Sequence, residues 1–275
     1  MGIACARGWE DNPCAMRTAA KVRFIATTMG AAAVIAAAFG QSGALPQRPP
    51  DGGTREVLVS ILIPSLPNAP FSAIVNTLWV RQLADGSSIT LANHRAIARD
   101  KEGRIFQERR LLVPEDGKHE SVVTQIEISD PVAHQQYICV PQQHVCQLEP
   151  FSPPAFVPPP PRGSASAVKQ SPNVDLEDLG TQSMAGLETT GTRQTMVMEA
   201  GAIGNDIPIT VTREFWYSPQ LGVNVVSKLQ DPRIGKQTFE LSNVALGDPD
   251  STLFQPPPNS HIIDLRKTES IPSPQ

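Results

Sequence analysis

The stretch REFWYSPQLGVNVVSK, residues 213–228, places three consecutive aromatic residues directly before a Ser-Pro turn and a second apolar run. Apolar and polar residues alternate with a period of two on both sides of this turn, which is typical of β-strands. The pattern therefore predicts two antiparallel strands that are joined at residues 218–221.

The strand before the turn has one apolar face and one largely polar face. Its apolar side comprises Ile207, Ile209, Val211, Phe215 and Tyr217, and its other side comprises Thr210, Thr212, Glu214 and Trp216. The apolar side continues on the next two predicted strands through Leu221, Val223, Val225, Phe239 and Leu241. Such a wall is a core face by default, and it becomes a ligand surface if the sheet curls around an unfilled hollow. For that second case we predict four ligand-binding residues: Phe215, Tyr217, Val225 and Phe239.

Similar alternation extends in both directions along the chain. Residues 71–83, 88–98 and 105–113 alternate between short polar turns, and residues 187–199, 207–217, 222–229 and 236–246 do so in the second half. We predict a mainly β fold with few helices, in which a single, strongly curved antiparallel sheet forms a half-open barrel. A β-sandwich is the alternative. The best helical candidate is residues 174–187.

A proline-rich segment at residues 150–173 divides the strands into two runs. Proline cannot donate to a strand ladder and favours an extended polyproline path. Each run alone would leave one face of its sheet unsupported. We therefore predict one β domain over residues 45–265 that this linker interrupts, followed by a disordered polar tail at residues 266–275.

Residues 1–44 have the pattern of a secretory signal peptide. Arg17, Lys21 and Arg23 precede an apolar, alanine-rich run at residues 25–39, and small residues follow it. This run is shorter than the about 20 residues that a bilayer span requires. We therefore predict cleavage near residue 40 or 44 rather than a retained anchor, and a periplasmic or secreted location. Residues 1–15 lie outside the pattern, so we expect translation to start at Met16.

Two cysteines lie beyond the predicted signal peptide, in YICVPQQHVCQL, residues 137–148. If Val140 and Val145 pair across the intervening turn, Cys139 stands directly opposite Cys146. In an exported protein this arrangement predicts a disulfide. The nearby His134 and His144 leave a zinc site as the less favoured alternative.

Charge and motifs exclude several classes of function. The formal net charge of −4 argues against nucleic acid or an anionic membrane as partner. The sequence lacks the nucleophile elbow, the zinc-binding helix motif, the P-loop and the dinucleotide fingerprint. The glycines of AGAIGND, residues 200–206, predict a hairpin turn. We therefore expect no enzymatic activity, no cofactor and no metal, whereas the sequence leaves the oligomeric state open.

The C-terminal third resembles the end of the outer-membrane lipoprotein carrier superfamily. The resemblance rests on Trp216-Tyr217-Ser218-Pro219, the apolar run 221–226, the turn 231–235, the FELSN strand at 239–243, and Phe254 with Pro257. The AGAIGND, WYSP and DPR segments are also similar to those of a group of exported bacterial proteins. The resemblance implies a half-open antiparallel barrel whose concave face can hold acyl chains.

Two functions remain open at this point. One is an exported, non-enzymatic protein that binds an apolar, lipid-like ligand or a lipidated partner in the concavity of the sheet. The other is an envelope structural or interaction protein with a fully packed core and no small-molecule ligand.

Overall fold

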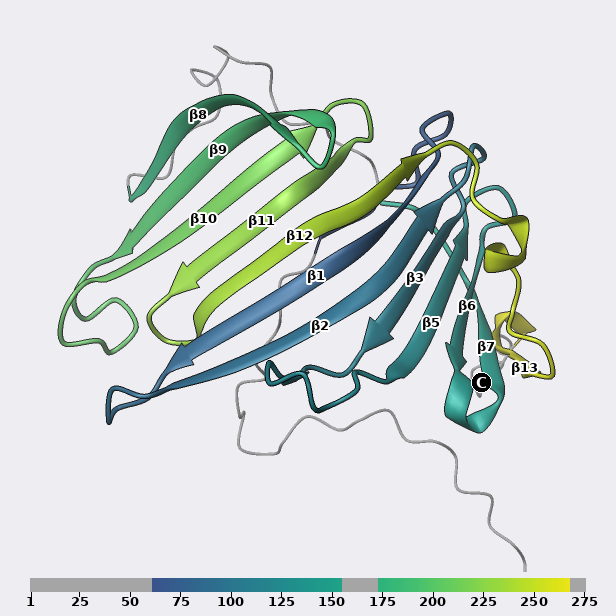
Figure 1. Ribbon diagram of the computed structural model, residues 1–275, viewed down its shortest axis with the longest axis horizontal. Coiled ribbons are helices and arrows are strands. Elements are labelled where there is room, and N and C mark those ends of the chain that lie inside the picture. Colours follow the sequence, from purple (N-terminus) through teal and green to yellow (C-terminus); the bar gives the residue numbers. More distant parts are fainter. Residues whose placement is uncertain (1–60, 155–172, 268–275) are drawn as a thin grey trace, which may run out of the picture. The chain divides into compact units, whose positions relative to one another are not determined.

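The computed structural model describes residues 61–154 and 173–267, which form one 13-stranded sheet and three short 3-10 helices (Figure 1). The strands of the first run are β1 (Phe71–Gln82), β2 (Ser88–Arg99), β3 (Ile105–Arg110), β4 (Val113–Pro114), β5 (Val123–Asp130), β6 (Gln135–Val140) and β7 (Val145–Pro150). Those of the second run are β8 (Val174–Met184), β9 (Leu187–Met198), β10 (Ile209–Ser218), β11 (Val223–Asp231), β12 (Gly235–Leu246) and β13 (His261–Asp264). The predicted signal peptide and most of the proline-rich linker lie outside the described residues.

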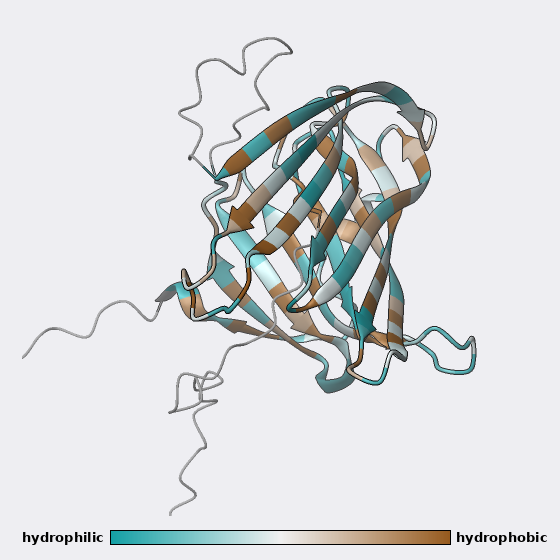
Figure 2. Ribbon diagram, turned by 90° about the vertical axis from the view of Figure 1, so that its left-hand side faces the viewer, coloured by the Kyte–Doolittle hydropathy of each residue, from teal (hydrophilic) through white to brown (hydrophobic). Residues whose placement is uncertain are grey.

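The two runs of strands share the sheet because β1 pairs with both β2 and β12. Val75 lies opposite Leu241, and Thr77 lies opposite Phe239. The order is β13-β7-β6-β5-β3-β2-β1-β12-β11-β10-β9-β8, with β4 paired to β2 beside this path. The two end strands of this order do not pair with each other, so the sheet is curved but open, as Figure 2 shows. The predicted mainly β fold with a single open sheet is confirmed, and the sandwich is not observed.

Four irregularities interrupt the pairing and contribute to the bending of the strands. The register shifts between Ser72 and Ile74, between Arg109 and Arg110, between Asp178 and Gly180, and between Trp216 and Tyr217. A β-bulge bends its strand and increases the local right-handed twist. These shifts therefore favour the strong curvature that the sequence pattern predicted but could not localise.

The register defines two faces of the sheet. We call the side that carries Val75, Val225 and Phe239 the inner face, and the side that carries Asn76 and Glu240 the outer face. Inner side chains of β1, β11 and β12 are buried, whereas outer ones are mostly half-buried or exposed. The resulting alternation of apolar and polar residues along the strands is visible in Figure 2.

Two groups of buried side chains form the core. The larger one lies mainly on the inner face and includes Phe71, Val75, Ile97, Val225, Phe239 and Leu241, together with Ile61 and Ile63 from the segment before β1. The smaller one comprises Ala98, Phe106, Ile128 and Phe254. It lies on the outer face, because Phe106 pairs with Ala98 and Ile128 at outer positions.

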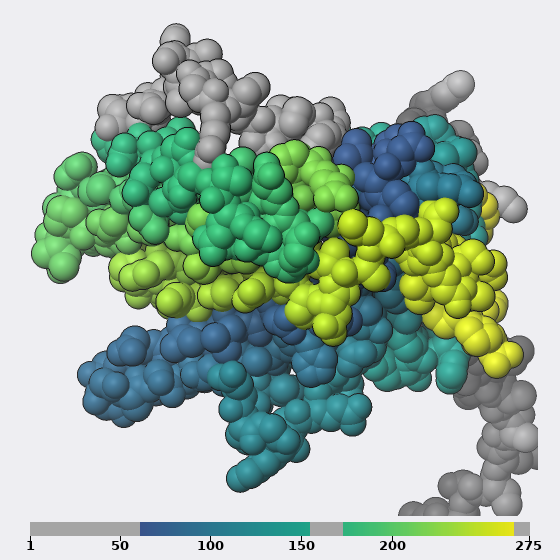
Figure 3. All heavy atoms as spheres, turned by 45° about the horizontal axis from the view of Figure 1, so that its top comes forward, coloured from purple at the N-terminus to yellow at the C-terminus, as the bar shows by residue number. Residues whose placement is uncertain are grey.

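The segment after β12 crosses to the far end of the sheet. Helix η2 (Ser251–Phe254) packs Phe254 into the smaller core, and β13 then pairs with β7 in parallel. Figure 3 shows this last part of the chain in yellow, beside the teal strands of the first run. The sheet is therefore not entirely antiparallel, which corrects the prediction. After β12 the chain passes β1, β2, β3, β5 and β6 before it reaches β7. A connection of this length allows β13 to run in the same direction as β7, which a tight hairpin does not allow.

Three further expectations are revised. The helical candidate at residues 174–187 is β8 and its turn, because β8 pairs with β9 along almost its entire length. Ile207, predicted on the apolar face of the aromatic strand, lies before β10 and is 72% exposed. The predicted tail at residues 266–275 begins inside helix η3 (Leu265–Lys267), where Arg266 contacts Asp264 and Gln135, and its remainder lies outside the described residues.

Candidate functional site

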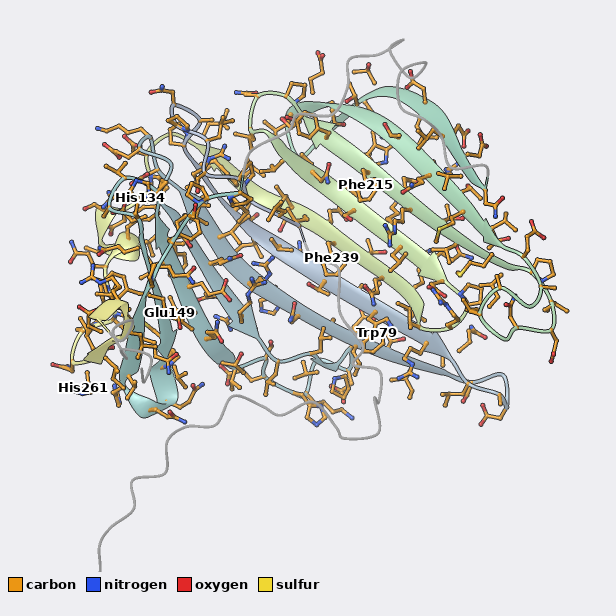
Figure 4. The ribbon with its side chains drawn as sticks, turned by 180° about the vertical axis from the view of Figure 1, so that it is seen from behind. Trp79, His134, Glu149, Phe215, Phe239 and His261 are labelled. Carbon is orange, nitrogen blue, oxygen red and sulfur yellow. A yellow bond between two sulfur atoms is a disulfide. The ribbon has the colours of Figure 1, made fainter. Side chains whose placement is uncertain are left out.

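The aromatic strand β10 presents its side chains to both faces of the sheet. Phe215 lies opposite Ser227 of β11, which in turn lies opposite Phe239 of β12. Phe215 and Phe239 therefore flank Ser227 on the inner face. Figure 4 labels both phenylalanines, together with Trp79 of β1, the strand next to β12. The sequence-based assignment of Phe215 and Phe239 to one face agrees with this register.

The four predicted ligand-binding residues differ in their burial. Val225 is 0% exposed and Phe239 is 2% exposed, and both belong to the larger core. Phe215 and Tyr217 are only half-buried. The structure thus brings the four residues onto neighbouring strands, with two of them in the core and two at a partly open surface.

A buried arginine, which sequence reasoning missed, holds the segment before β1 beside this region. Arg99 is 0% exposed and donates to the carbonyl oxygens of Pro64 at 2.9 Å, Ala69 at 2.7 Å and Leu221 at 2.6 Å. Its guanidinium also stacks on Phe71. Burial lowers the pKa of Arg99 to about 10, so the group stays positively charged at neutral pH. Its acceptors are backbone carbonyl groups from three separate positions in the chain, which leave no pattern in the sequence.

Arg99 also influences Tyr217 of the aromatic strand. Burial raises the pKa of the Tyr217 hydroxyl, and the positive charge of Arg99 partly opposes this effect. The two residues therefore belong to one electrostatic environment at the end of β10. Tyr217 is neutral at physiological pH and is able to donate a hydrogen bond there.

A small recess lies on the inner face of β9 and β10, beside the half-buried aromatic residues. It has a volume of about 30 Å³ and is lined by Gln194, Met196, Val211 and Arg213. This volume corresponds to about one water molecule. The recess alone therefore does not accommodate a lipid chain, which would need the open surface around it.

The inner face becomes polar on the other side of β1. Arg109 of β3 donates to Glu127 of β5 at 2.9 Å, and Gln107 and Gln125 donate to the same carboxylate. Arg95 of β2 is buried beside them, and burial followed by the charge of Arg109 lowers its pKa to about 10. The inner face therefore carries this polar group on β2, β3 and β5, whereas its buried apolar side chains are concentrated on β11, β12 and β1.

The tryptophan between Phe215 and Tyr217 points to the outer face. Its indole packs against Gly191 and Leu179, and its N–H donates to Glu214 at 2.9 Å. Burial would raise the pKa of Glu214, but hydrogen bonds from Lys228, Trp216 and Arg193 outweigh it and lower the pKa to about 2. Trp216 is therefore a buried structural residue that extends the larger core to the outer face, on the side of β10 that the sequence pattern predicted for it.

The cysteine hairpin has the predicted geometry. Val140 lies opposite Val145, and Cys139 lies opposite Cys146, with which it forms a disulfide. Both sulfur atoms are therefore unavailable as zinc ligands. His134 and His144 occupy turn positions with φ of 51° and 52°. Among residues 61–154 and 173–267, no group of three or more candidate ligands is arranged to hold a metal ion.

No protein-family model matches the chain, and no curated protein is significantly similar to it. In the part of the chain that the structure describes, no helix has the length and apolar character required to cross a membrane.

Several solved structures are similar to the chain at low sequence identity. MucB of Pseudomonas aeruginosa, solved in a complex with MucA, is 15% identical over 70% of this chain, with a TM-score of 0.34. A LolA superfamily protein from Nitrosomonas europaea is 8% identical over 69% of this chain and 91% of its own, with a TM-score of 0.26. LprF from Mycobacterium bovis is 14% identical over 70% of this chain and 91% of its own, with a TM-score of 0.29.

The chain spans 58% of the Pseudomonas MucB chain. TM-scores below 0.5 reflect only partial superposition, so these proteins assign neither a ligand nor a site residue. Over about 70% of its length, the chain is similar to a LolA superfamily protein, to LprF and to MucB.

Proposed function

We propose that the chain is an exported, non-enzymatic binding protein of the cell envelope that holds an apolar, lipid-like ligand or a lipidated partner against its inner face. The observation that carries the proposal is the unequal burial of the predicted residues. Phe215 and Tyr217 stay half-exposed on the same face on which Val225 and Phe239 are fully buried. When an apolar chain covers an apolar surface that lies open beside a packed core, the free energy of the system falls.

The polarity of the inner face gives the ligand a preferred direction. The apolar side chains of β10, β11, β12 and β1 would contact the hydrocarbon part of the ligand. The polar side chains around Glu127 on β3 and β5 lie beyond β1, on its other side in the sheet. A ligand with one apolar and one polar end fits this division better than a purely apolar one, because buried polar groups require partners.

A packed structural or interaction protein is the second candidate, and a different observation favours it. Ile61 and Ile63 belong to the same core group as Val225 and Phe239, so part of the inner face is already covered by the chain itself. The recess beside Met196 holds only about one water molecule. In this case the half-buried aromatic residues would contact a protein partner or remain without one.

Native mass spectrometry of the protein purified from its own host separates the two candidates. The first predicts a bound species of lipid mass that is released by organic solvent, whereas protein that is repeatedly free of such a species supports the second. The double variant Phe215→Ala and Tyr217→Ala should carry less of the bound species. Leu78→Ala is the matched control, since Leu78 is also half-buried but lies on the outer face of β1. The intact mass also reports whether residues 1–44 have been removed.

A further inference from the structure

The two edges of the sheet are treated differently. At one end, β7 is covered by β13, which pairs with it through residues 261–264 and is itself a short edge strand of 4 residues. At the other end, β8 is the last strand of the sheet, and within the described residues nothing pairs with its outer side. An open edge strand presents a row of unpaired backbone N–H and C=O groups, which is a template for another strand.

Strand β8 is long and exposed, with distinct side chains on its two faces. Val174 and Leu176 lie on the inner face, opposite Met196 and Gln194 of β9. Asp175 and Glu177 alternate with them on the outer face, and both are exposed, as is Leu176. A strand added along β8 would therefore meet apolar side chains on one face and carboxylates on the other.

The outer face carries a row of charges that alternates across neighbouring strands. Glu177 of β8 pairs with Arg193 of β9 at 2.8 Å, and Arg193 pairs with Glu214 of β10 at 3.0 Å. Glu214 also pairs with Lys228 of β11 at 2.9 Å. The sequence of charges is negative, positive, negative and positive, and it ends at the sheet edge with Glu177, whose side chain is 53% exposed. A positive side chain on an added strand would continue this row.

The inner face beside β8 offers a matching apolar surface. Val174, Met196 and Val211 lie in one row across β8, β9 and β10, next to the small recess that Met196 and Val211 help to line. Leu176 is 37% exposed in the adjacent row. Methionine adapts its shape to different apolar partners, which suits a surface that receives another side chain.

From these observations we infer that the outer edge of β8 is a docking site for an extended segment of a partner protein, whose basic residues lie opposite Asp175 and Glu177 and whose apolar residues lie opposite Val174 and Leu176. The interaction is strand addition, in which the backbone gives affinity and the alternating side chains give specificity. Pairing with β8 of a second copy is disfavoured, because β8 carries acidic and no basic residues. The inference is independent of the ligand that is proposed above for the inner face.

Short synthetic peptides test this site on the full chain. The probe is a ten-residue peptide of alternating lysine and leucine, and one comparison peptide has glutamate in place of lysine. A second comparison peptide has the probe's sequence with N-methyl groups on alternate backbone amides, which block pairing and keep charge and apolarity. Fluorescence anisotropy should show that the probe binds and that the two comparison peptides do not. Hydrogen exchange should show slower exchange of the β8 amides when the probe is present.

Two variants and a matched control make the result specific. Asp175→Lys combined with Glu177→Gln should weaken probe binding about three- to tenfold, as expected for the loss of exposed charge pairs. Glu240→Lys changes an exposed acidic residue on the outer face of the interior strand β12 and should leave binding unchanged. The inference is overturned by equal binding of the N-methylated peptide, by unprotected β8 amides in the complex, or by a dimer that forms through β8.

Discussion

Arg99 donates from Nη2 to the carbonyl oxygen of Leu221 at 2.6 Å, although 122 residues separate them along the chain. This contact joins β2 of the first run to the β10–β11 turn of the second. The same guanidinium also binds the carbonyl oxygens of Pro64 and Ala69. One buried side chain therefore fixes the segment before β1 and the end of the aromatic strand in a common position.

We expect Arg99→Ala to lower the free energy of unfolding by about 3–5 kcal/mol, because it leaves several buried carbonyl groups without a donor. Urea denaturation followed by circular dichroism measures the change. Lys101→Ala is the control, since the Lys101 side chain is 62% exposed, and it should change stability little. A loss below about 1 kcal/mol for Arg99→Ala would contradict the role assigned to this residue.

The pKa of Glu214 predicts a pH-dependent contribution to stability. Its folded-state pKa is lowered from 4.5 to about 2. A depressed carboxyl pKa contributes stability above the unfolded value, and this contribution is lost as pH falls from about 4.5 through about 2. We expect Glu214→Gln to be less sensitive to acid over this range than the unmodified chain.

The two described tryptophans provide a spectroscopic check on Glu214. The Trp216 indole N–H donates to Glu214, so its NMR shift should titrate with a midpoint near pH 2. The Trp79 indole N–H donates to the backbone carbonyl of Ile234 and should not follow this titration. A midpoint of the Trp216 signal close to pH 4.5 would show that the hydrogen bonds from Lys228, Trp216 and Arg193 do not lower the pKa of Glu214.

Local patterns predicted most of the strands and the pairing of the cysteine hairpin. The two faces of β10 and the opposition of Cys139 and Cys146 follow directly from the alternation of side chains and from the short turn. These features depend on residues that are close in sequence, which is why they could be derived without a structure.

The missed features depend on contacts between residues that are distant in sequence. The buried position of Arg99 requires carbonyl groups from the segment before β1 and from the β10–β11 turn. The parallel pairing of β13 with β7 requires the chain to cross most of the sheet. Ile207 satisfies the alternation but precedes the first paired residue of β10, Ile209, so periodicity alone placed it in the strand.

Loss of the disulfide should reduce stability by about 2–3 kcal/mol, because Cys139 and Cys146 close a short loop in the unfolded chain. The double variant Cys139→Ala and Cys146→Ala tests this by thermal denaturation. Reducing agent should destabilise the unmodified chain toward the level of the variant and leave the variant itself unchanged. Equal stability of the two proteins without reducing agent would refute the expected contribution.

Gly191 should tolerate no side chain while Trp216 is present. A Cβ atom at Gly191 would lie 2.7 Å from the Trp216 ring and 2.8 Å from Leu179 Cβ. We expect Gly191→Ala to cost about 1–3 kcal/mol by overpacking. In a double-mutant cycle, Trp216→Leu should make the alanine less destabilising, and strictly additive effects would argue against direct contact between the two residues.

The most direct test of the central claim is photo-crosslinking with a fatty acid that carries a diazirine on its chain, followed by mass spectrometric mapping of the modified peptides. The account predicts labelling of β10 around Phe215 and Tyr217, competition by unlabelled fatty acid, and reduced labelling in the Phe215→Ala and Tyr217→Ala double variant. Labelling that is confined to outer-face residues such as Leu78, or that does not respond to competitor, would show that the inner face is only a core.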